Sequence, residues 1–132
     1  MFYELSLKVS IVNAVGEEKE IKERYITDDL LFASVEQKGL KLYDNECDVF
    51  AIKRSKVTEI LNQRQYEDEF IYSATLAQII IDENTGKEKE TEEHVLFFAK
   101  NLKSATDYVL QYAKPYDMEV KSIKKTNIKE VI

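Results

Sequence analysis

Two lysine-rich segments contain the residues of this chain whose types and spacing best suit a chemical role. One spans residues 52–61 and the other lies within residues 118–132. Cationic side chains at such spacing bind phosphates, and tyrosines, of which the chain has 8, stack on unpaired bases. If the two segments are neighbours in the fold, they form a cationic stripe on a chain of formal charge −6. The candidate nucleic-acid-binding residues are Lys53, Arg54, Lys56, Lys121, Lys124, Lys125 and Lys129.

The same residues also fit a role without nucleic acid. Exposed lysines on strands deter edge-to-edge aggregation, and most tyrosines fill cores or interfaces. From the cationic segments and the tyrosines, our first expectation is a non-enzymatic accessory protein that binds single-stranded DNA through its lysine-rich face. The alternative is a protein-interaction module, namely an adaptor, an assembly subunit or an inhibitor. Exposed sheet edges would suit strand addition or a homodimer.

Residues typical of catalysis are sparse in the sequence. His94 is the single histidine and lies beside Glu92 and Glu93, which is typical of a solvated or bridging side chain. Cys47 has no histidine nearby in the sequence and is expected to be a small, buried apolar residue. One histidine and one cysteine cannot supply a zinc site, and no glycine-rich phosphate loop is present. We expect no enzymatic activity, no cofactor and no metal.

Composition and length indicate one folded protein in a reducing compartment. The 132 residues are 44% hydrophobic and 33% charged, which is typical of a soluble globular chain. The lone cysteine allows no intrachain disulfide. The sequence shows neither a signal peptide nor an apolar run of the ~20 residues that a membrane helix needs. We expect a cytoplasmic location and no membrane partner.

The sequence contains an internal repeat. A glycine followed by alternating glutamate and lysine occurs at residues 16–23 and again at residues 86–93. The segment 52–61 similarly resembles the segment 123–132. A lone repeat of about 60 residues is near the lower limit for a stable core, so the two copies are expected to pack together. This predicts one compact domain built from two repeats, residues 1–62 and 63–132.

Each repeat is expected to begin with a β-hairpin followed by a helix. Apolar and polar residues alternate over 3–11, a turn follows at 13–16, and a charged strand covers 17–27. A helix is expected from about residue 32, with Gly39 at a close approach of its backbone to the sheet. In the second repeat we expect strands at 70–82 and 88–98, a polar linker at 62–69, and a helix over 102–114. Ser104 and Asp107 have the spacing of a capping box, and Pro115 ends this helix.

The closing segments allow two interpretations. The apolar phase slips between Ile52 and Val57, and again between Ile123 and Ile128. A β-bulge near Ser55 and near Thr126 explains the slips, and so does a helical turn; the β-branched content favours the bulge. The expected fold class is α+β, with two tandem ββαβ repeats of mainly antiparallel sheet, one helix each, related by a pseudo-twofold axis.

The hairpin and the two closing segments resemble a domain-of-unknown-function family. The shared pattern in the closing segments is Ile-Lys-Arg/Lys-Ser/Thr-x-Val/Ile-x-Glu-Ile/Val, and the resemblance covers residues 2–132. The family is associated with Bacteroidetes and their phages, including the crAss-like group. The resemblance implies the cytoplasm of a bacterium or of a phage-infected host cell, and it assigns no site residues.

Overall fold

The computed structural model describes residues 1–132, which divide into two compact units. Unit 1 consists of Met1–Lys56 together with Asn127–Ile132, and unit 2 consists of Val57–Thr126. The chain therefore leaves unit 1 after Lys56 and returns to it after Thr126 for its last six residues.

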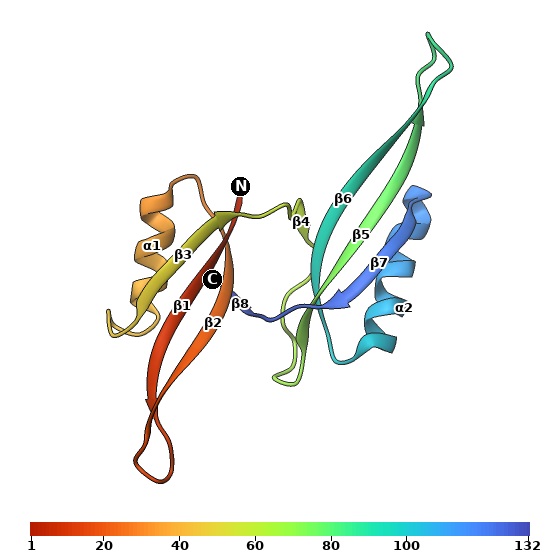
Figure 1. Ribbon diagram of the computed structural model, residues 1–132. Helices are drawn as coiled ribbons and strands as arrows, with labels where there is room; N and C mark the ends of the chain where they lie inside the picture. The colour runs from red at the N-terminus through yellow and green to blue at the C-terminus, as the bar shows by residue number, and fades with distance from the viewer. The chain divides into compact units, whose positions relative to one another are not determined.

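Unit 1 is a four-stranded sheet with one helix on one face (Figure 1). The strand order is β3-β1-β2-β8. The central strand β1 is antiparallel to β2 and to β3, and β8 is parallel to β2. The elements are β1 (Phe2–Val12), β2 (Glu18–Asp28), α1 (Phe32–Lys41), β3 (Asp48–Arg54) and β8 (Ile128–Val131).

Unit 2 has the corresponding arrangement, with strand order β4-β6-β5-β7. Strand β5 is antiparallel to β6 and to β7, and the short β4 is parallel to β6. The elements are β4 (Glu59–Ile60), β5 (Phe70–Ile81), β6 (Glu88–Ala99), α2 (Leu102–Ala113), the short 3-10 helix η1 (Lys114–Tyr116) and β7 (Glu119–Lys125).

The expected layout of two tandem ββαβ repeats is wrong, although the protein is α+β in the broad sense and its sheets are mainly antiparallel. The structure has two four-stranded sheets, and each includes one parallel strand from the other half of the sequence. Strand β8 comes from the end of the chain and pairs with β2, whereas β4 lies before residue 62 and pairs with β6. Three strands of each sheet come from one half of the sequence, and the fourth, β8 or β4, comes from the other half.

The slip of apolar phase in the closing segments marks this exchange of strands. Neither a bulge at Ser55 and Thr126 nor a helical turn occurs there. Instead, β3 ends at Arg54 and β4 begins at Glu59 in the other sheet, and β7 ends at Lys125 before β8 begins at Ile128. The bulges lie earlier, where the β1–β3 register shifts between Ser6 and Leu7 and the β5–β7 register shifts between Thr75 and Leu76.

The core of unit 1 lies between α1 and the odd-numbered residues of β1. Tyr3, Leu5, Leu7 and Val9 are buried there with Val35 of α1. At Gly39 an added Cβ would lie 2.6 Å from Leu5 Cδ1, 3.2 Å from Val49 and 3.3 Å from Leu7. The expected close approach at Gly39 is therefore confirmed.

Both hairpins extend past their third strands as two-stranded arms (Figure 1). Strand β3 pairs with β1 only over Tyr3–Lys8, and β7 pairs with β5 only over Tyr72–Ala77. The arm of unit 2 exposes three consecutive isoleucines, Ile79 (63%), Ile80 (49%) and Ile81 (61%). Gly86 has φ +68° in the turn, a conformation that favours glycine.

The start of α2 differs from the expected capping box. Asn101 is the N-cap, and its side chain accepts a hydrogen bond from the Ser104 amide at 2.8 Å. Asn is among the preferred N-cap residues because its short side chain reaches a free amide of the first turn. Pro115 lies in η1 directly after the helix, as expected of a residue that cannot continue it.

Candidate functional site

The open face of unit 1, which we define as the sheet face opposite α1, presents Phe50 on the bulge of β3. Residue 51 pairs with Ser6 and residue 49 pairs with Leu7, so Phe50 is the additional residue. A bulge redirects a side chain, and the Phe50 ring lies on the open face with 43% of its surface exposed. An aromatic ring at this position can receive a planar ligand.

Two lysines lie over the Phe50 ring. Lys8 and Lys22 are directly paired across β1 and β2, and their ammonium nitrogens lie 4.9 and 5.8 Å from the ring centroid. Lys8 is on the open face because its neighbours on β1, Leu7 and Val9, are buried on the α1 side. Lys22 is directly opposite Lys8 and therefore lies on the same face. The geometry is that of a cation–π contact at an exposed site.

Arg24 and Lys53 add two more cations to this face. Arg24 Nη2 lies 2.7 Å from Glu4 Oε2, and Lys53 Nζ lies 3.5 Å from the same oxygen. Glu18, Glu20, Asp28 and Asp48 are the further carboxylates on the open face, because they pair with even-numbered residues of β1. The four cations therefore lie among five carboxylates, and the positive charge is local to the Phe50 ring, where Lys8 and Lys22 lie.

The candidate residues predicted in unit 1 lie in different environments. Lys53 is on the open face, but Arg54 pairs with Tyr3 and lies on the α1 side, because successive strand residues alternate. Lys56 follows β3, near the point where the chain leaves unit 1. Lys129, on β8, donates to the Glu23 carboxylate. Of these four residues, strand pairing places only Lys53 on the open face with Phe50.

The candidates in unit 2 are mostly engaged with other side chains. Lys121 occupies the bulge position of β7 and forms an ion pair with Glu90 and a second one with Glu92. Lys124 pairs with Ser73 on the sheet face opposite α2, and Lys125 lies on the other face with its ammonium 3.5 Å from the Phe70 ring centroid. These three lysines therefore do not form one cationic surface within unit 2.

The sequence interpretation missed Lys8, Lys22, Arg24 and Phe50. The alternation of β1 places Lys8 opposite its apolar residues, and this signal could have indicated an exposed lysine there. No comparable signal exists for Phe50, because its direction depends on a bulge that appears only when β3 pairs with β1. The site therefore depends on long-range pairing.

Glu23 is a nearly buried carboxylate, 8% exposed, on the α1 side of β2. It accepts hydrogen bonds from Tyr25 at 3.2 Å, from Tyr43 and from Lys129. Burial alone would raise the pKa of Glu23, but hydrogen bonds from Lys129 and Tyr43 and the charge of Lys129 outweigh it and lower the pKa. Burial in turn raises the pKa of Tyr25 well above its ordinary value, with further contributions from Tyr43 and Glu23.

His94 and Cys47 lie in separate settings. The His94 ring is near Glu92, with a distance of 3.9 Å from Nε2 to the carboxylate, and its Nδ1 lies 3.4 Å from the Thr75 hydroxyl. Cys47 is half-buried, and its sulfur lies 3.6 Å from the carbonyl oxygen of Gly39. Burial, followed by the charges of Asp48 and Glu23, raises the pKa of the Cys47 thiol. A thiol in this setting is a poor nucleophile at neutral pH.

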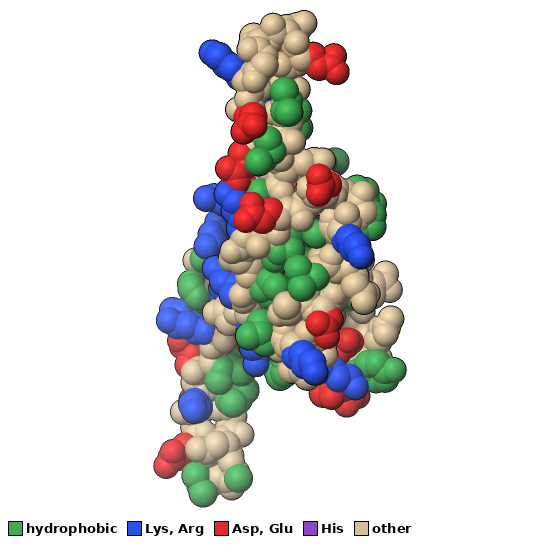
Figure 2. Space-filling model, turned by 90° about the vertical axis from the view of Figure 1, so that its right-hand side faces the viewer, with side chains coloured by type: hydrophobic (Ala, Val, Ile, Leu, Met, Phe, Trp, Pro, Cys, Tyr) green, Lys and Arg blue, Asp and Glu red, His purple; other side chains and the backbone are tan.

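On the face that Figure 2 displays, lysine and arginine side chains and aspartate and glutamate side chains are both present. No cluster of three or more histidine, cysteine, aspartate or glutamate side chains is positioned to hold a metal ion. Neither helix has the length and apolar character needed to cross a membrane.

Comparison with known proteins identifies a family without an assigned function. The sequence matches a domain of unknown function, DUF4494, over residues 1–132. No curated protein and no solved structure matches the chain significantly. The match confirms the resemblance to a domain-of-unknown-function family. Because it covers the whole sequence, the chain belongs to the DUF4494 family.

Proposed function

We propose that the protein is a non-enzymatic accessory protein that binds single-stranded nucleic acid on the open face of unit 1. The observation that carries this proposal is the Phe50 ring, which is exposed on the bulge of β3 with the ammonium groups of Lys8 and Lys22 over it. Arg24 and Lys53 lie on the same sheet face, where both pair with Glu4. A sheet face that combines an aromatic ring with cations binds single strands by stacking and charge.

The contacts that now cover Phe50 can be exchanged for a base. An exposed cation–π contact contributes about 0.5–1 kcal/mol, whereas stacking of a base on an aromatic side chain contributes ~1–3 kcal/mol. A base on the ring would displace the two ammonium groups toward the adjacent phosphates. Lys8 and Lys22 would then bind the backbone while Phe50 holds the base.

Fluorescence anisotropy with a labelled oligothymidine of about ten nucleotides tests this proposal. Neutralising three or four phosphates should give a slope of log K against log salt of about −2 to −3. We expect Phe50→Ala to weaken binding by about tenfold through loss of stacking. Lys8→Gln and Lys22→Gln should each weaken binding and make the salt slope shallower.

The matched control is Lys121→Gln, because Lys121 has the corresponding bulge position in unit 2 and pairs with Glu90 and Glu92. This variant should leave the affinity unchanged. Absence of binding at about 50 mM salt, or equal affinity of Phe50→Ala and the parent protein, would contradict the proposal.

The cellular context forms part of the same proposal. The resemblance of the closing segments to proteins of Bacteroidetes and their phages supports an accessory role in a phage or mobile element. Single strands arise during replication and recombination of such genomes. The cytoplasm of a bacterium or of a phage-infected host cell is the corresponding location.

A second candidate function, a protein-interaction module, is favoured by the arm of unit 2. Residues 78–81 pair only with β6, so their other edge exposes unpaired backbone groups. Ile79, Ile80 and Ile81 carry no charge that would deter strand addition, and the exposed apolar side chains along this arm are visible at the top of Figure 2. Another strand could pair with this edge.

Light scattering after size-exclusion chromatography tests the second candidate. If the arm binds another strand, Ile80→Lys should reduce self-association or binding of a partner, because it places a charge on the exposed edge. Lys89→Gln on the adjacent strand β6 is the control, since it leaves the isoleucines unchanged. A monomer at all concentrations with no partner from a bacterial lysate would contradict this function.

A further inference from the structure

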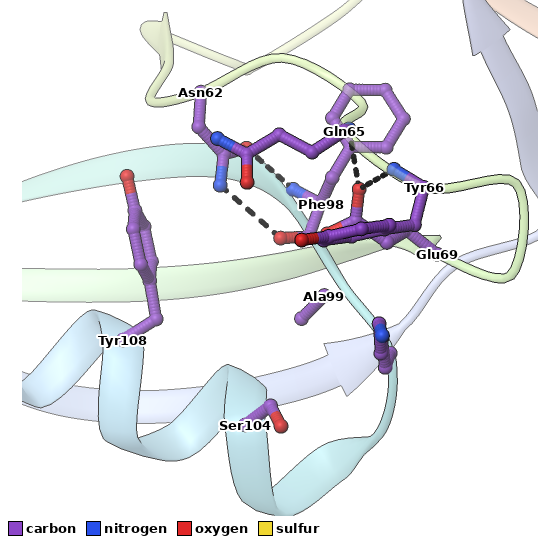
Figure 3. Close-up of a pocket in the computed structure, with 9 residues that line it drawn as sticks. Asn62, Gln65, Tyr66, Glu69, Phe98, Ala99, Ser104 and Tyr108 are labelled. Atoms are coloured by element: carbon purple, nitrogen blue, oxygen red, sulfur yellow. Dashed lines mark hydrogen bonds between the residues drawn. The ribbon is translucent and has the colours of Figure 1, made fainter.

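Unit 2 contains a pocket of about 460 Å³ between the loop 62–69 and the start of α2. Figure 3 shows Tyr108 and Ser104 on the side of α2, Gln65 and Tyr66 on the loop, and Ala99 between them. Lys100 also lines the pocket. All lining residues belong to unit 2, so the pocket is complete within that unit.

The loop that forms one wall is fixed by hydrogen bonds at both ends. Asn62 accepts a bond from the Phe98 amide at 2.7 Å and donates to the Phe98 carbonyl at 3.1 Å, which continues the pairing of β4 with β6 (Figure 3). At the other end the Glu69 carboxylate accepts bonds from the amides of Gln65 at 2.6 Å and Tyr66 at 2.9 Å. The wall is therefore ordered before any ligand binds, which lowers the entropic cost of binding.

Three aromatic side chains line the pocket, and one of them, Tyr66, has a lysine beside it. The Tyr66 ring is exposed, and the Lys100 ammonium lies 4.2 Å from its centroid. The nearest carboxylate to this ammonium is that of Asp68, at 4.0 Å. Ring stacking and an ionic contact are thus available within one small volume.

Several groups in the pocket remain available for polar contacts. The Gln65 carboxamide and the Ser104 hydroxyl form no side-chain hydrogen bond within the chain, whereas Asn62 is fully engaged with Phe98. A carboxamide offers both a donor and an acceptor, as base edges require. These groups could select a heteroaromatic ring over a purely apolar one.

The charges favour an anionic ligand over a cationic one. The aromatic faces near the pocket already carry cations of the chain, with Lys100 over Tyr66 and the Arg64 guanidinium 4.9 Å from the Phe98 ring centroid. The Glu69 carboxylate is directed to the loop amides and is not available to an ammonium group. A ligand cation would have to displace Lys100 without gaining a free carboxylate.

We propose that this pocket binds a nucleoside phosphate, with the base stacked on Tyr66 and the phosphate bound by Lys100. Gln65 and Ser104 would contact the edge of the base or the sugar. The ligand could be a free mononucleotide or the phosphorylated end of a strand, since both present a planar ring and a phosphate. This site shares no residue with the open face of unit 1, so it stands independently of the function proposed there.

NMR titration of the full chain with four probes tests the proposal. The probes are a mononucleotide, the corresponding nucleoside, inorganic phosphate and a 5′-phosphorylated oligonucleotide. We expect the mononucleotide to shift the amide signals of Lys100 and Ser104, and the nucleoside and phosphate to bind about tenfold more weakly because each lacks one of the two contacts. If the strand end is the ligand, the 5′-phosphorylated oligonucleotide will bind more tightly than its unphosphorylated form.

Variants connect the shifts to the pocket and separate them from the open face. Tyr66→Leu and Lys100→Gln should each weaken binding about tenfold, whereas Tyr116→Leu, an exposed tyrosine outside the pocket, should not. Phe50→Ala should leave these shifts unchanged. Saturable shifts that persist in both Tyr66→Leu and Lys100→Gln, or no shift with either the mononucleotide or the phosphorylated oligonucleotide, would overturn the proposal.

Discussion

Lys129 donates a hydrogen bond to the carboxylate of Glu23, although 106 residues separate the two in the sequence. Glu23 lies on β2 and Lys129 on β8, so the contact joins the start of the chain to its end within unit 1. Thr27 reinforces the connection by donating to the Ile132 carbonyl at 2.8 Å. The last strand is therefore attached by side chains as well as by backbone pairing.

Removing the cation of this pair should destabilise the protein. We expect Lys129→Met to lower the free energy of unfolding by about 1–3 kcal/mol, because the nearly buried Glu23 carboxylate loses its charged donor. Urea unfolding followed by circular dichroism measures the change. Lys19→Met, at an exposed position on the arm of unit 1, should change the free energy by less than about 0.5 kcal/mol. Equal effects of the two substitutions would contradict the role of the pair.

The Glu23 carboxylate should make the stability of the protein depend on pH in the acidic range. The pKa of Glu23 is lowered in the folded state, so its contribution to stability is present above the ordinary carboxyl value of 4.5 and is lost as the pH falls through the lowered value. We expect Glu23→Gln to destabilise the protein at neutral pH and to reduce the loss of stability between about pH 5 and about pH 3. Urea midpoints at several pH values measure this difference. A Glu23→Gln variant with the same acid dependence as the parent protein would show that other carboxylates dominate.

The sequence was sufficient for most individual elements. The alternation of residues 3–11 predicted β1, the glycine-containing turns separated the hairpin strands, and the helical periodicity predicted α1 and α2. Gly39 was correctly related to a close helix–sheet contact. These features depend on residues close together in the sequence, where the periodicity of apolar side chains is directly visible.

Local sequence patterns do not indicate which strands the short strands β4 and β8 pair with. Residues 128–131 and 59–60 read as continuations of the preceding strands, yet they pair in the other sheet. Nothing in their own composition distinguishes the two possibilities, because a β-branched strand suits either sheet. The open face of unit 1 was missed for a related reason, since Phe50 is directed there only by the bulge against Ser6.

Weakening the packing of the last strand, β8, should destabilise unit 1 more than unit 2. Ile128 is 6% exposed, so we expect Ile128→Ala to cost about 2–4 kcal/mol, whereas the exposed Ile80→Ala should cost less than about 0.5 kcal/mol. Hydrogen exchange should show faster amide exchange near residues 24–26 of β2, which pair with β8. Faster exchange confined to β5 and β6 would contradict the assignment of β8 to the sheet of unit 1.

Gly39 and Leu5 should show compensating effects on packing. An alanine at position 39 would gain about 1 kcal/mol of helix propensity, but its Cβ would lie 2.6 Å from Leu5 Cδ1, and such overpacking costs ~1–3 kcal/mol. In unit 2 the corresponding positions hold Val109 and Ala74, both buried in one cluster, so the larger side chain is on the helix and the smaller one is on the strand. The two units thus divide a similar volume differently between helix and strand.

A double-mutant cycle measures this compensation. We expect Gly39→Ala alone to destabilise the protein and Leu5→Ala alone to cost about 2–5 kcal/mol, because it leaves a cavity beneath α1. In the double variant the new methyl group occupies part of that cavity, so the combined loss should be smaller than the sum by about 0.5–3 kcal/mol. Leu5→Ala combined with Glu36→Ala, on the exposed side of α1, should be additive. Additivity of Gly39→Ala with Leu5→Ala would mean that the helix moves away from the sheet instead of packing into the vacated space.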